Sequence, residues 1–364
     1  MKANGGYPDL TKVRRALVIV FKNIGDVLLT TPVFSALKRS IAGVEVDALV
    51  NRGTEEMLTF NPDVDRVLVY NRKTRGLGRL KEELRLVKEV RGAGYDMAVA
   101  LTSGDRSRNF ALLSGAGIRV GAPKKNLLGQ LSFNFPVTMA SSGKHYVERN
   151  LDCLRRIGIF PERQHRSTSF FEGSEAAEKA RGLLAGANLD GRPYMVVHPT
   201  SRWMFKSWPP EKNAALIDLV QRELGMPVVL TSGPEAFEIS YVAQLKSRLT
   251  TDVTDFTGKL SLKELGAVIR KAVLFFGVDS APMHISAAVG TPAVALFGPS
   301  FAVDWAPWGD GHRVVTSDRH SCVPCGKDGC GGGKVSDCLV ELDVRTVYDA
   351  VREMLGKSSH RRSI

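Results

Sequence analysis

The segment GVDSAPMHISAAVG, residues 277–290, places polar residues between two apolar runs, AVLFF and PAVALF, that are typical of buried strands. Asp279 and Ser280 are residue types that cap helix N-termini. Pro282 suits the first turn of a helix. The spacing predicts a short helix whose first residues are Ser280, Ala281 and Pro282. We expect the free N–H groups at this N-terminus to bind an anion. A well-capped helix without a ligand has the same pattern.

A second segment, HPTSRWMFKSWPPEKN, follows the apolar run YMVV. Its hydroxyl donors are Thr200 and Ser201, and its cations are Arg202 and Lys206. Hydroxyls and cations clustered beyond a strand end suit a phosphate or a diphosphate. A third segment, TSGPEAFE, also follows a strand, and its Glu235 either accepts from ribose hydroxyls or simply opens a helix.

The corresponding turn in the first half is FKNIGDVLLTTP, which lacks the G-x-G-x-x-G fingerprint of dinucleotide binding. Asp26 begins the helix that follows, and it is either a cap or a general base. A helix N-terminus favours the charged form of a carboxyl group, so we expect Asp26 to be ionised. His284 lies one turn after Ser280, where a ligand contact and a structural histidine are both open interpretations.

Apolar runs alternate with amphipathic helical segments through both halves of the chain. Strands are predicted at residues 15–21, 44–50, 65–70, 95–101, 194–198, 227–232, 272–276 and 292–297. This alternation indicates an α/β protein with two Rossmann-like, doubly wound domains facing a central cleft. The expected parts are an N-terminal domain (1–180), a linker near 172–192, a C-terminal domain (190–342) and a final helix with a basic tail (343–364).

Composition narrows the class of protein. The chain has 364 residues, a formal charge of +12 and 43% hydrophobic residues, which is globular. We expect a cytoplasmic protein, because neither a membrane span nor a secretory signal is evident. The basic residues are spread along the chain, which argues against nucleic acid as a partner. The charge indicates an anionic substrate, an anionic membrane surface or merely a solvated basic surface.

Four of the five cysteines form the pattern C-x2-C-x4-C-x7-C, at Cys322, Cys325, Cys330 and Cys338. In a cytosolic chain such a cluster indicates free thiols or a metal rather than disulfides. The spacing matches no common zinc pattern cleanly. We therefore interpret the segment as a glycine-rich structural or acceptor-side loop, with zinc as the alternative.

Four motifs together resemble glycosyltransferase family nine, the bacterial lipopolysaccharide heptosyltransferases. They are NIGDVLLTTP, HPTSRWMFKSWP, FTGKLSLKELGAVI and GVDSAPMHISAAVGTPAVALFGPS. The resemblance runs from about Arg15 to Val347. The segments KHYVERNLDCLRRIGI and CVPCGKDGCGGGKVSDCL are most similar to the branch that adds the third inner-core heptose.

The resemblance implies a GT-B fold, with acceptor binding in the N-terminal domain and ADP-L-glycero-D-manno-heptose binding in the C-terminal domain. It implies inverting transfer of heptose to a heptose of the lipopolysaccharide core, with Asp26 in the place of the catalytic base. Residues that fall on the donor motifs are Thr200, Ser201, Lys206, Asp279 and His284. No D-x-D pair lies at a strand end, so this interpretation requires neither a metal nor another cofactor beside the donor substrate ADP-heptose.

The expected mechanism follows from these roles. Asp26 takes the acceptor hydroxyl proton, and the transition state resembles an oxocarbenium ion. Lys206 and the helix terminus at 280–282 stabilise the departing ADP. The acceptor is anionic and membrane-anchored, so we expect peripheral association with the inner membrane. The alternatives are transfer of the first or second heptose, a nucleotide-sugar epimerase of the same architecture, and a non-enzymatic nucleotide-sugar sensor.

Overall fold

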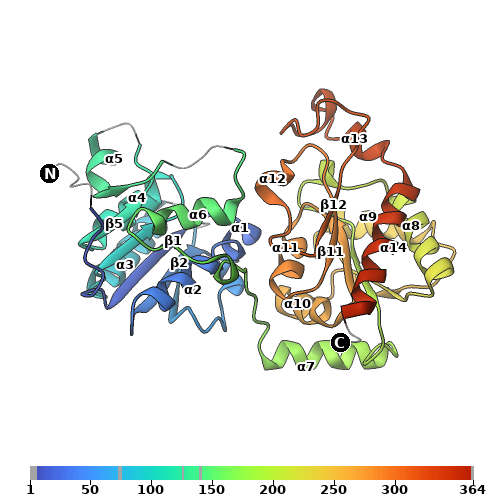
Figure 1. Ribbon diagram of the computed structural model, residues 1–364, viewed down its shortest axis with the longest axis horizontal. Coiled ribbons are helices and arrows are strands. Elements are labelled where there is room, and N and C mark those ends of the chain that lie inside the picture. Colours follow the sequence, from blue (N-terminus) through green and yellow to red (C-terminus); the bar gives the residue numbers. More distant parts are fainter. Residues whose placement is uncertain (1–5, 73–75, 125–126, 139–141, 362–364) are drawn as a thin grey trace. The chain divides into compact units, whose positions relative to one another are not determined.

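The computed structural model describes residues 6–72, 76–124, 127–138 and 142–361. The chain divides into two compact units, Met1–Phe171 and Glu172–Ile364 (Figure 1). Each unit is built around its own six-stranded parallel sheet. Two doubly wound α/β units confirm the predicted fold class.

The first sheet has the strand order β3-β2-β1-β4-β5-β6. Its strands are β1 (Arg15–Val20), β2 (Glu45–Asn51), β3 (Arg66–Tyr70), β4 (Met97–Ala100), β5 (Ile118–Gly121) and β6 (Phe135–Pro136). The central strands β1 and β4 are continuous apolar runs that are buried along nearly their whole length. Such runs are required where helices cover both faces of a parallel sheet.

In the part of this unit that the structure describes, six α-helices and two 3-10 turns accompany the sheet. They are α1 (Ile24–Leu28), α2 (Thr31–Ser40), α3 (Gly76–Gly92), α4 (Asp105–Leu113), α5 (Leu127–Ser132), α6 (Tyr146–Arg155), η1 (Glu55–Met57) and η2 (Arg163–His165). Helix α4 packs against both α3 and α5, and α2 packs against α6. One face of the sheet forms a core with α3 and α4, in which Leu86, Val90 and Phe110 meet Leu17 and Ile19 of β1.

The second sheet has the order β12-β11-β10-β7-β8-β9, which is the same winding as the first. Its strands are β7 (Met195–His198), β8 (Val228–Leu230), β9 (Thr254–Asp255), β10 (Leu274–Val278), β11 (Ala293–Leu296) and β12 (Arg313–Val315). In each sheet the chain reverses its direction of winding between two adjacent strands, β1 and β4 in one and β7 and β10 in the other. Ligands of doubly wound sheets bind beyond the carboxyl ends of the strands at this switch point.

The helices of the second unit complete its layers. They are α7 (Ser174–Gly186), α8 (Pro210–Leu224), α9 (Ala236–Lys246), α10 (Leu262–Lys271), α11 (Ala281–Ala288), α12 (Ala302–Trp305), α13 (Asp337–Val340), α14 (Val344–Arg361), η3 (Met204–Lys206) and η4 (Cys330–Gly332). Helix α14 packs on α8 and on β10, β11 and β12. Because its Val347, Tyr348 and Val351 are buried in the core, it belongs to the second unit.

The segment 172–192, which we interpreted as a linker, is largely the helix α7. It packs against α10, and Lys179 forms an ion pair of 2.6 Å with Glu264. The sequence SEAAEKARGLLAG is rich in strong helix formers, and this preference outweighs its small residues. The division between the units therefore precedes α7 and does not run through it.

Candidate functional site

The switch point of the second sheet brings together the two loops that the sequence analysis singled out. Strand β10 pairs with β7, and Gly277 lies opposite His198. A Cβ atom at Gly277 would lie only 2.8 Å from the carbonyl oxygen of His198, so a side chain there would force the strands apart. The close approach places the Ser201 hydroxyl 3.4 Å from the carbonyl oxygen of Asp279, to which it donates.

Lys206 completes this cluster from the end of η3. Its ammonium donates to the Asp279 carboxylate at 2.6 Å. The Lys206 side chain is 24% exposed and that of Asp279 only 10%, so the pair sits at the surface with the carboxylate beneath the ammonium. An oriented, partly accessible ammonium is a suitable point charge for a phosphate group.

The N-terminus of α11 adds a third element. Ser280 is the N-cap in an extended conformation, followed by Ala281 and Pro282 in the first turn. The Ser280 hydroxyl makes no cap bond and, among the described residues, has no hydrogen-bond partner although it is buried. A helix terminus with a spare hydroxyl is suited to receive an anion. His284 is buried one turn further into α11.

We expected the Thr200 hydroxyl to face a ligand, but the structure places it inside the unit. It is fully buried, and its hydroxyl donates to Glu238 Oε2 at 2.5 Å. The same oxygen accepts the Gly233 N–H at 3.1 Å. A Cβ atom at Gly233 would lie 2.5 Å from Glu238 Oε1, so a side chain there would displace the Glu238 carboxylate. Thr200 thus ties the loop after β7 to the loop after β8 through Glu238.

Sequence reasoning missed Glu238, whose only signal was a carboxylate in the first turn of a helix that follows a strand end. Glu235, which we singled out in its place, is an exposed N-cap residue of α9 without a cap hydrogen bond. Arg202 is exposed as well, with its guanidinium 5.8 Å from the ring centroid of Trp203. Both residues lie in loops at the carboxyl edge of the second sheet.

Asp26 lies at the switch point of the first sheet, in the short helix that follows β1. Its Oδ2 accepts the Asn23 N–H at 3.1 Å, as part of a capping box. Burial raises the pKa of the Asp26 carboxyl group, while the Lys22 charge and hydrogen bonds from Asn23 act in the opposite direction. We expected the helix N-terminus to favour the charged form, but α1 has only five residues and burial dominates. A raised pKa makes the carboxylate a stronger base, because an effective general base has a pKa near the pH at which the enzyme works.

Cations follow four adjacent strands of the first sheet, and we call them the cationic edge. They are Lys22 after β1, Arg52 after β2, Arg72 after β3 and Arg106 at the start of α4. Within the described ranges none of them forms an ion pair, although Arg106 lies 4.4 Å from the ring centroid of Tyr70. At the opposite edge the cations are compensated, as in Arg15–Glu45 at 2.9 Å. Carboxylates nevertheless lie within electrostatic range of three of them, Asp26 for Lys22, Glu82 for Arg52 and Glu83 for Arg106, so the charge of the cationic edge is partly compensated.

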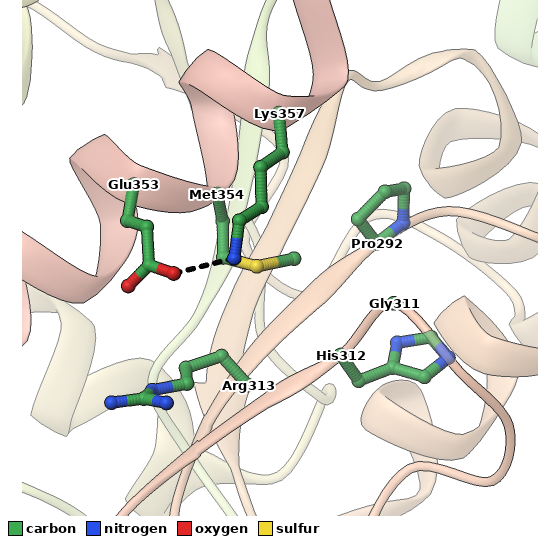
Figure 2. Close-up of a pocket in the computed structure, with 7 residues that line it drawn as sticks. All are labelled: Pro292, Gly311, His312, Arg313, Glu353, Met354 and Lys357. Carbon is green, nitrogen blue, oxygen red and sulfur yellow. Dashed lines mark hydrogen bonds and ion pairs between the residues drawn. The ribbon is translucent and has the colours of Figure 1, made fainter. Parts of the chain in front are cut away.

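A pocket of about 280 Å3 lies at the other edge of the second sheet, between the end of α14 and the starts of β11 and β12 (Figure 2). Pro292 and Met354 contribute apolar surface, and the Lys357–Glu353 ion pair of 2.5 Å spans one side. Ligands of doubly wound sheets bind at the carboxyl edge, so this pocket is no candidate for the nucleotide site.

The cysteine segment contains free thiols. Cys338 is buried, and its burial together with the nearby charges of Cys330, Cys325 and Cys322 raises the pKa of its thiol to about 11. In the part of the chain that the structure describes, no three His, Cys, Asp or Glu side chains converge as metal ligands. Over the same residues, no helix combines the length and the hydropathy that crossing a membrane requires.

Two doubly wound units of identical winding, each with polar residues at its switch point, form the GT-B fold that the motifs predicted. The model of glycosyltransferase family 9 (heptosyltransferase) matches residues 83–335. The chain belongs to this family, as its motifs predicted, and it is a glycosyltransferase.

Individual relatives agree with this assignment. The chain is 35% identical over 289 residues to lipopolysaccharide heptosyltransferase 3 of Escherichia coli K12, covering 78% of this chain and 82% of the relative. The family 9 glycosyltransferase of Veillonella parvula has a TM-score of 0.83 at 20% identity, covering 96% and 99% of the two chains. The E. coli heptosyltransferase WaaC, solved with ADP, has a TM-score of 0.72 at 20% identity, covering 93% and 99%.

Proposed function

We propose that this protein transfers L-glycero-D-manno-heptose from ADP-heptose to a heptose of the lipopolysaccharide inner core. The transferred sugar becomes the third heptose of the core, and the configuration at its anomeric carbon is inverted. The observation that carries the proposal is the 35% identity to heptosyltransferase 3, which extends over most of both chains. ADP in the solved structure of WaaC supports the nucleotide part of the donor. The cation, hydroxyl and helix terminus at the second switch point provide the chemistry that a diphosphate needs.

The donor diphosphate binds to Lys206, Ser201 and the α11 N-terminus at Ser280–Pro282. Negative charge grows on ADP as the glycosidic bond breaks, and preformed donors stabilise this charge without reorganisation. Asp279 holds the Lys206 ammonium in place at 2.6 Å. Arg202 and Glu235 lie in the loops around this cluster, where Glu235 would accept from ribose hydroxyls. Thr200 contributes by positioning its loop, since its hydroxyl is bonded to Glu238.

Asp26 acts as the general base. It removes the acceptor hydroxyl proton while the oxygen attacks the anomeric carbon from the side opposite ADP, which inverts that centre. The carboxylate must be ionised, and its raised pKa makes it a stronger base than an exposed aspartate. Lys206 supplies positive charge at the leaving group, so the mechanism requires neither a metal nor another cofactor.

The acceptor is anionic. The cationic edge offers four cationic side chains beyond adjacent strand ends, a suitable surface for the phosphates and acidic sugars of an inner core. The protein acts in the cytoplasm, and its net charge of +12 further favours peripheral association with the anionic inner-membrane surface.

The direct test combines purified protein, ADP-heptose and defined truncated cores, followed by mass measurement of the saccharide. A core that carries two heptoses should gain one heptose. A core without heptose that gains one would show first-heptose transfer, and a core with a single heptose that gains one would show second-heptose transfer. Consumption of ADP-heptose without any acceptor product would indicate an epimerase or a hydrolase.

A further inference from the structure

Helix α3 exposes three leucines on one face. Leu77, Leu80 and Leu84 are 78%, 53% and 60% exposed, and Leu77 has the highest exposed fraction of the large apolar residues that the structure describes. Their spacing of three and four residues places them on one side of the helix. Core packing does not account for them, because α3 already buries Leu86 and Val90 on its inner side.

Charge on α3 is segregated in the same way. Glu82, Glu83 and Glu89 are partly buried and compensated, for example by Arg85 and Arg66 at 2.9–3.0 Å. Lys81 and Lys88, in contrast, are exposed on the side of the three leucines. Within the described ranges neither lysine forms an ion pair.

We call Leu77, Leu80, Leu84, Lys81 and Lys88 the outer face of α3. It combines apolar side chains with uncompensated positive charge on a single helix, the chemistry of a helix that lies on an anionic interface. Leu113 of α4 and Leu131 of α5 are also exposed, and α4 packs against both α3 and α5. A second copy of the chain is a poor occupant, because it would place lysines against lysines.

We propose that the outer face of α3 docks on an anionic lipid bilayer, with the leucines entering the headgroup boundary and the lysines contacting lipid phosphates. This inference rests on the proposed function, which supplies a lipid-anchored acceptor. It identifies the surface that brings the first unit, with Asp26 and the cationic edge, to that acceptor.

The test measures binding of the full chain to vesicles by co-sedimentation, without either substrate. Vesicles of phosphatidylethanolamine with phosphatidylglycerol should bind the protein, and vesicles of phosphatidylcholine alone should not. L77Q/L80Q/L84Q keeps helix-forming residues and should weaken binding by about tenfold or more. K81Q/K88Q should weaken it by about fivefold for each lysine removed.

The control R248Q/K259Q removes the same charge from exposed positions in the second unit and should bind vesicles almost as wild type. All variants should retain heptose transfer to a lipid-free core oligosaccharide, which shows that they fold. Wild-type protein that ignores anionic vesicles, or a leucine variant that binds them unchanged, would overturn the proposal. The proposal would also be overturned if the wild-type protein sedimented as a dimer and L77Q/L80Q/L84Q sedimented as a monomer. If transfer fails with every core while vesicle binding follows this pattern, the proposed function fails and the docking surface stands.

Discussion

At the scale of single residues, the Lys206–Asp279 ion pair contributes both to the proposed donor site and to stability. Removing the ammonium takes away the proposed diphosphate contact and leaves a nearly buried carboxylate unpaired. We therefore expect Lys206→Ala to weaken ADP-heptose binding by roughly 10- to 100-fold, the value of a hydrogen bond to a charged group. It should also lower the free energy of unfolding. Calorimetric titration and chemical denaturation measure the two effects.

Two further variants separate these effects. Lys206→Ala/Asp279→Asn removes the stranded charge, so stability should recover while ADP-heptose affinity stays low. Lys259→Ala, a lysine whose ammonium donates to a backbone carbonyl away from the cluster, should leave affinity unchanged. Wild-type affinity in Lys206→Ala would exclude this residue from the donor site.

The pH dependence follows from the buried carboxyl group of Asp26. Its pKa is raised in the folded chain, so the folded state binds the proton at a higher pH than the unfolded state does. Turnover should fall as the pH decreases through this raised pKa, above the ordinary aspartate value of 3.8, because the base becomes protonated. The free energy of unfolding should rise as the pH decreases through this pKa, because protonation removes the unfavourable buried charge. A rate profile whose acid limb lies at or below 3.8 would contradict the assignment.

Glu238 acts at the scale of elements, because it ties the loops after β7 and β8. Glu238→Ala leaves the Thr200 hydroxyl and the Gly233 N–H without their acceptor. We expect a loss of about 1–3 kcal/mol in the free energy of unfolding, measured by denaturant titration. Glu235→Ala removes an exposed carboxylate three residues away and should leave stability unchanged. Equal effects of the two substitutions would show that the tie is unimportant.

The cysteine segment is also an element with a separable role. Cys338 is buried beside Leu339, whereas Cys322 is exposed and Cys325 half-exposed. Because we interpret the segment as a structural loop, Cys322→Ser/Cys325→Ser should change the melting temperature more than the rate of heptose transfer, and by a small amount since both thiols reach the surface. Elemental analysis of the purified protein provides the control. Stoichiometric zinc would show that the cysteines form a metal site and are not free thiols. A large loss of turnover at unchanged stability would place the segment in the active site.

Patterns confined to one segment could be predicted from the sequence, and contacts between segments could not. The apolar runs located β1, β7 and β10, and the cap residues located the start of α11 at Ala281. The Thr200–Glu238 bond joins residues 38 positions apart, so no local pattern reveals it. Helix α7 was not expected within the linker segment 172–192, because its Gly and Ser residues drew attention away from the Ala, Glu, Lys, Arg and Leu residues that favour a helix.

At the scale of the whole molecule, one winding is used twice for different chemistry. The switch point of the second sheet collects a cation, hydroxyls and a helix terminus, which suit a departing diphosphate. The switch point of the first sheet collects a buried carboxyl group and the cationic edge, which suit proton removal from an anionic acceptor. The repeated topology was predictable from the alternation of strands and helices. The raised pKa of Asp26 was not, because it depends on tertiary burial.

Asp26→Asn tests the central claim most directly, measured as heptose turnover beside ADP-heptose affinity. Asparagine keeps the size and capping ability of the side chain and removes proton acceptance. Loss of a general base should reduce turnover by about 10²–10⁴-fold. Donor affinity should remain near wild type because the proposed diphosphate contacts belong to the second unit. Stability at neutral pH should not fall, since a buried charge is removed. Turnover near that of wild type would contradict the account and leave Asp26 as the capping-box acceptor of the Asn23 N–H.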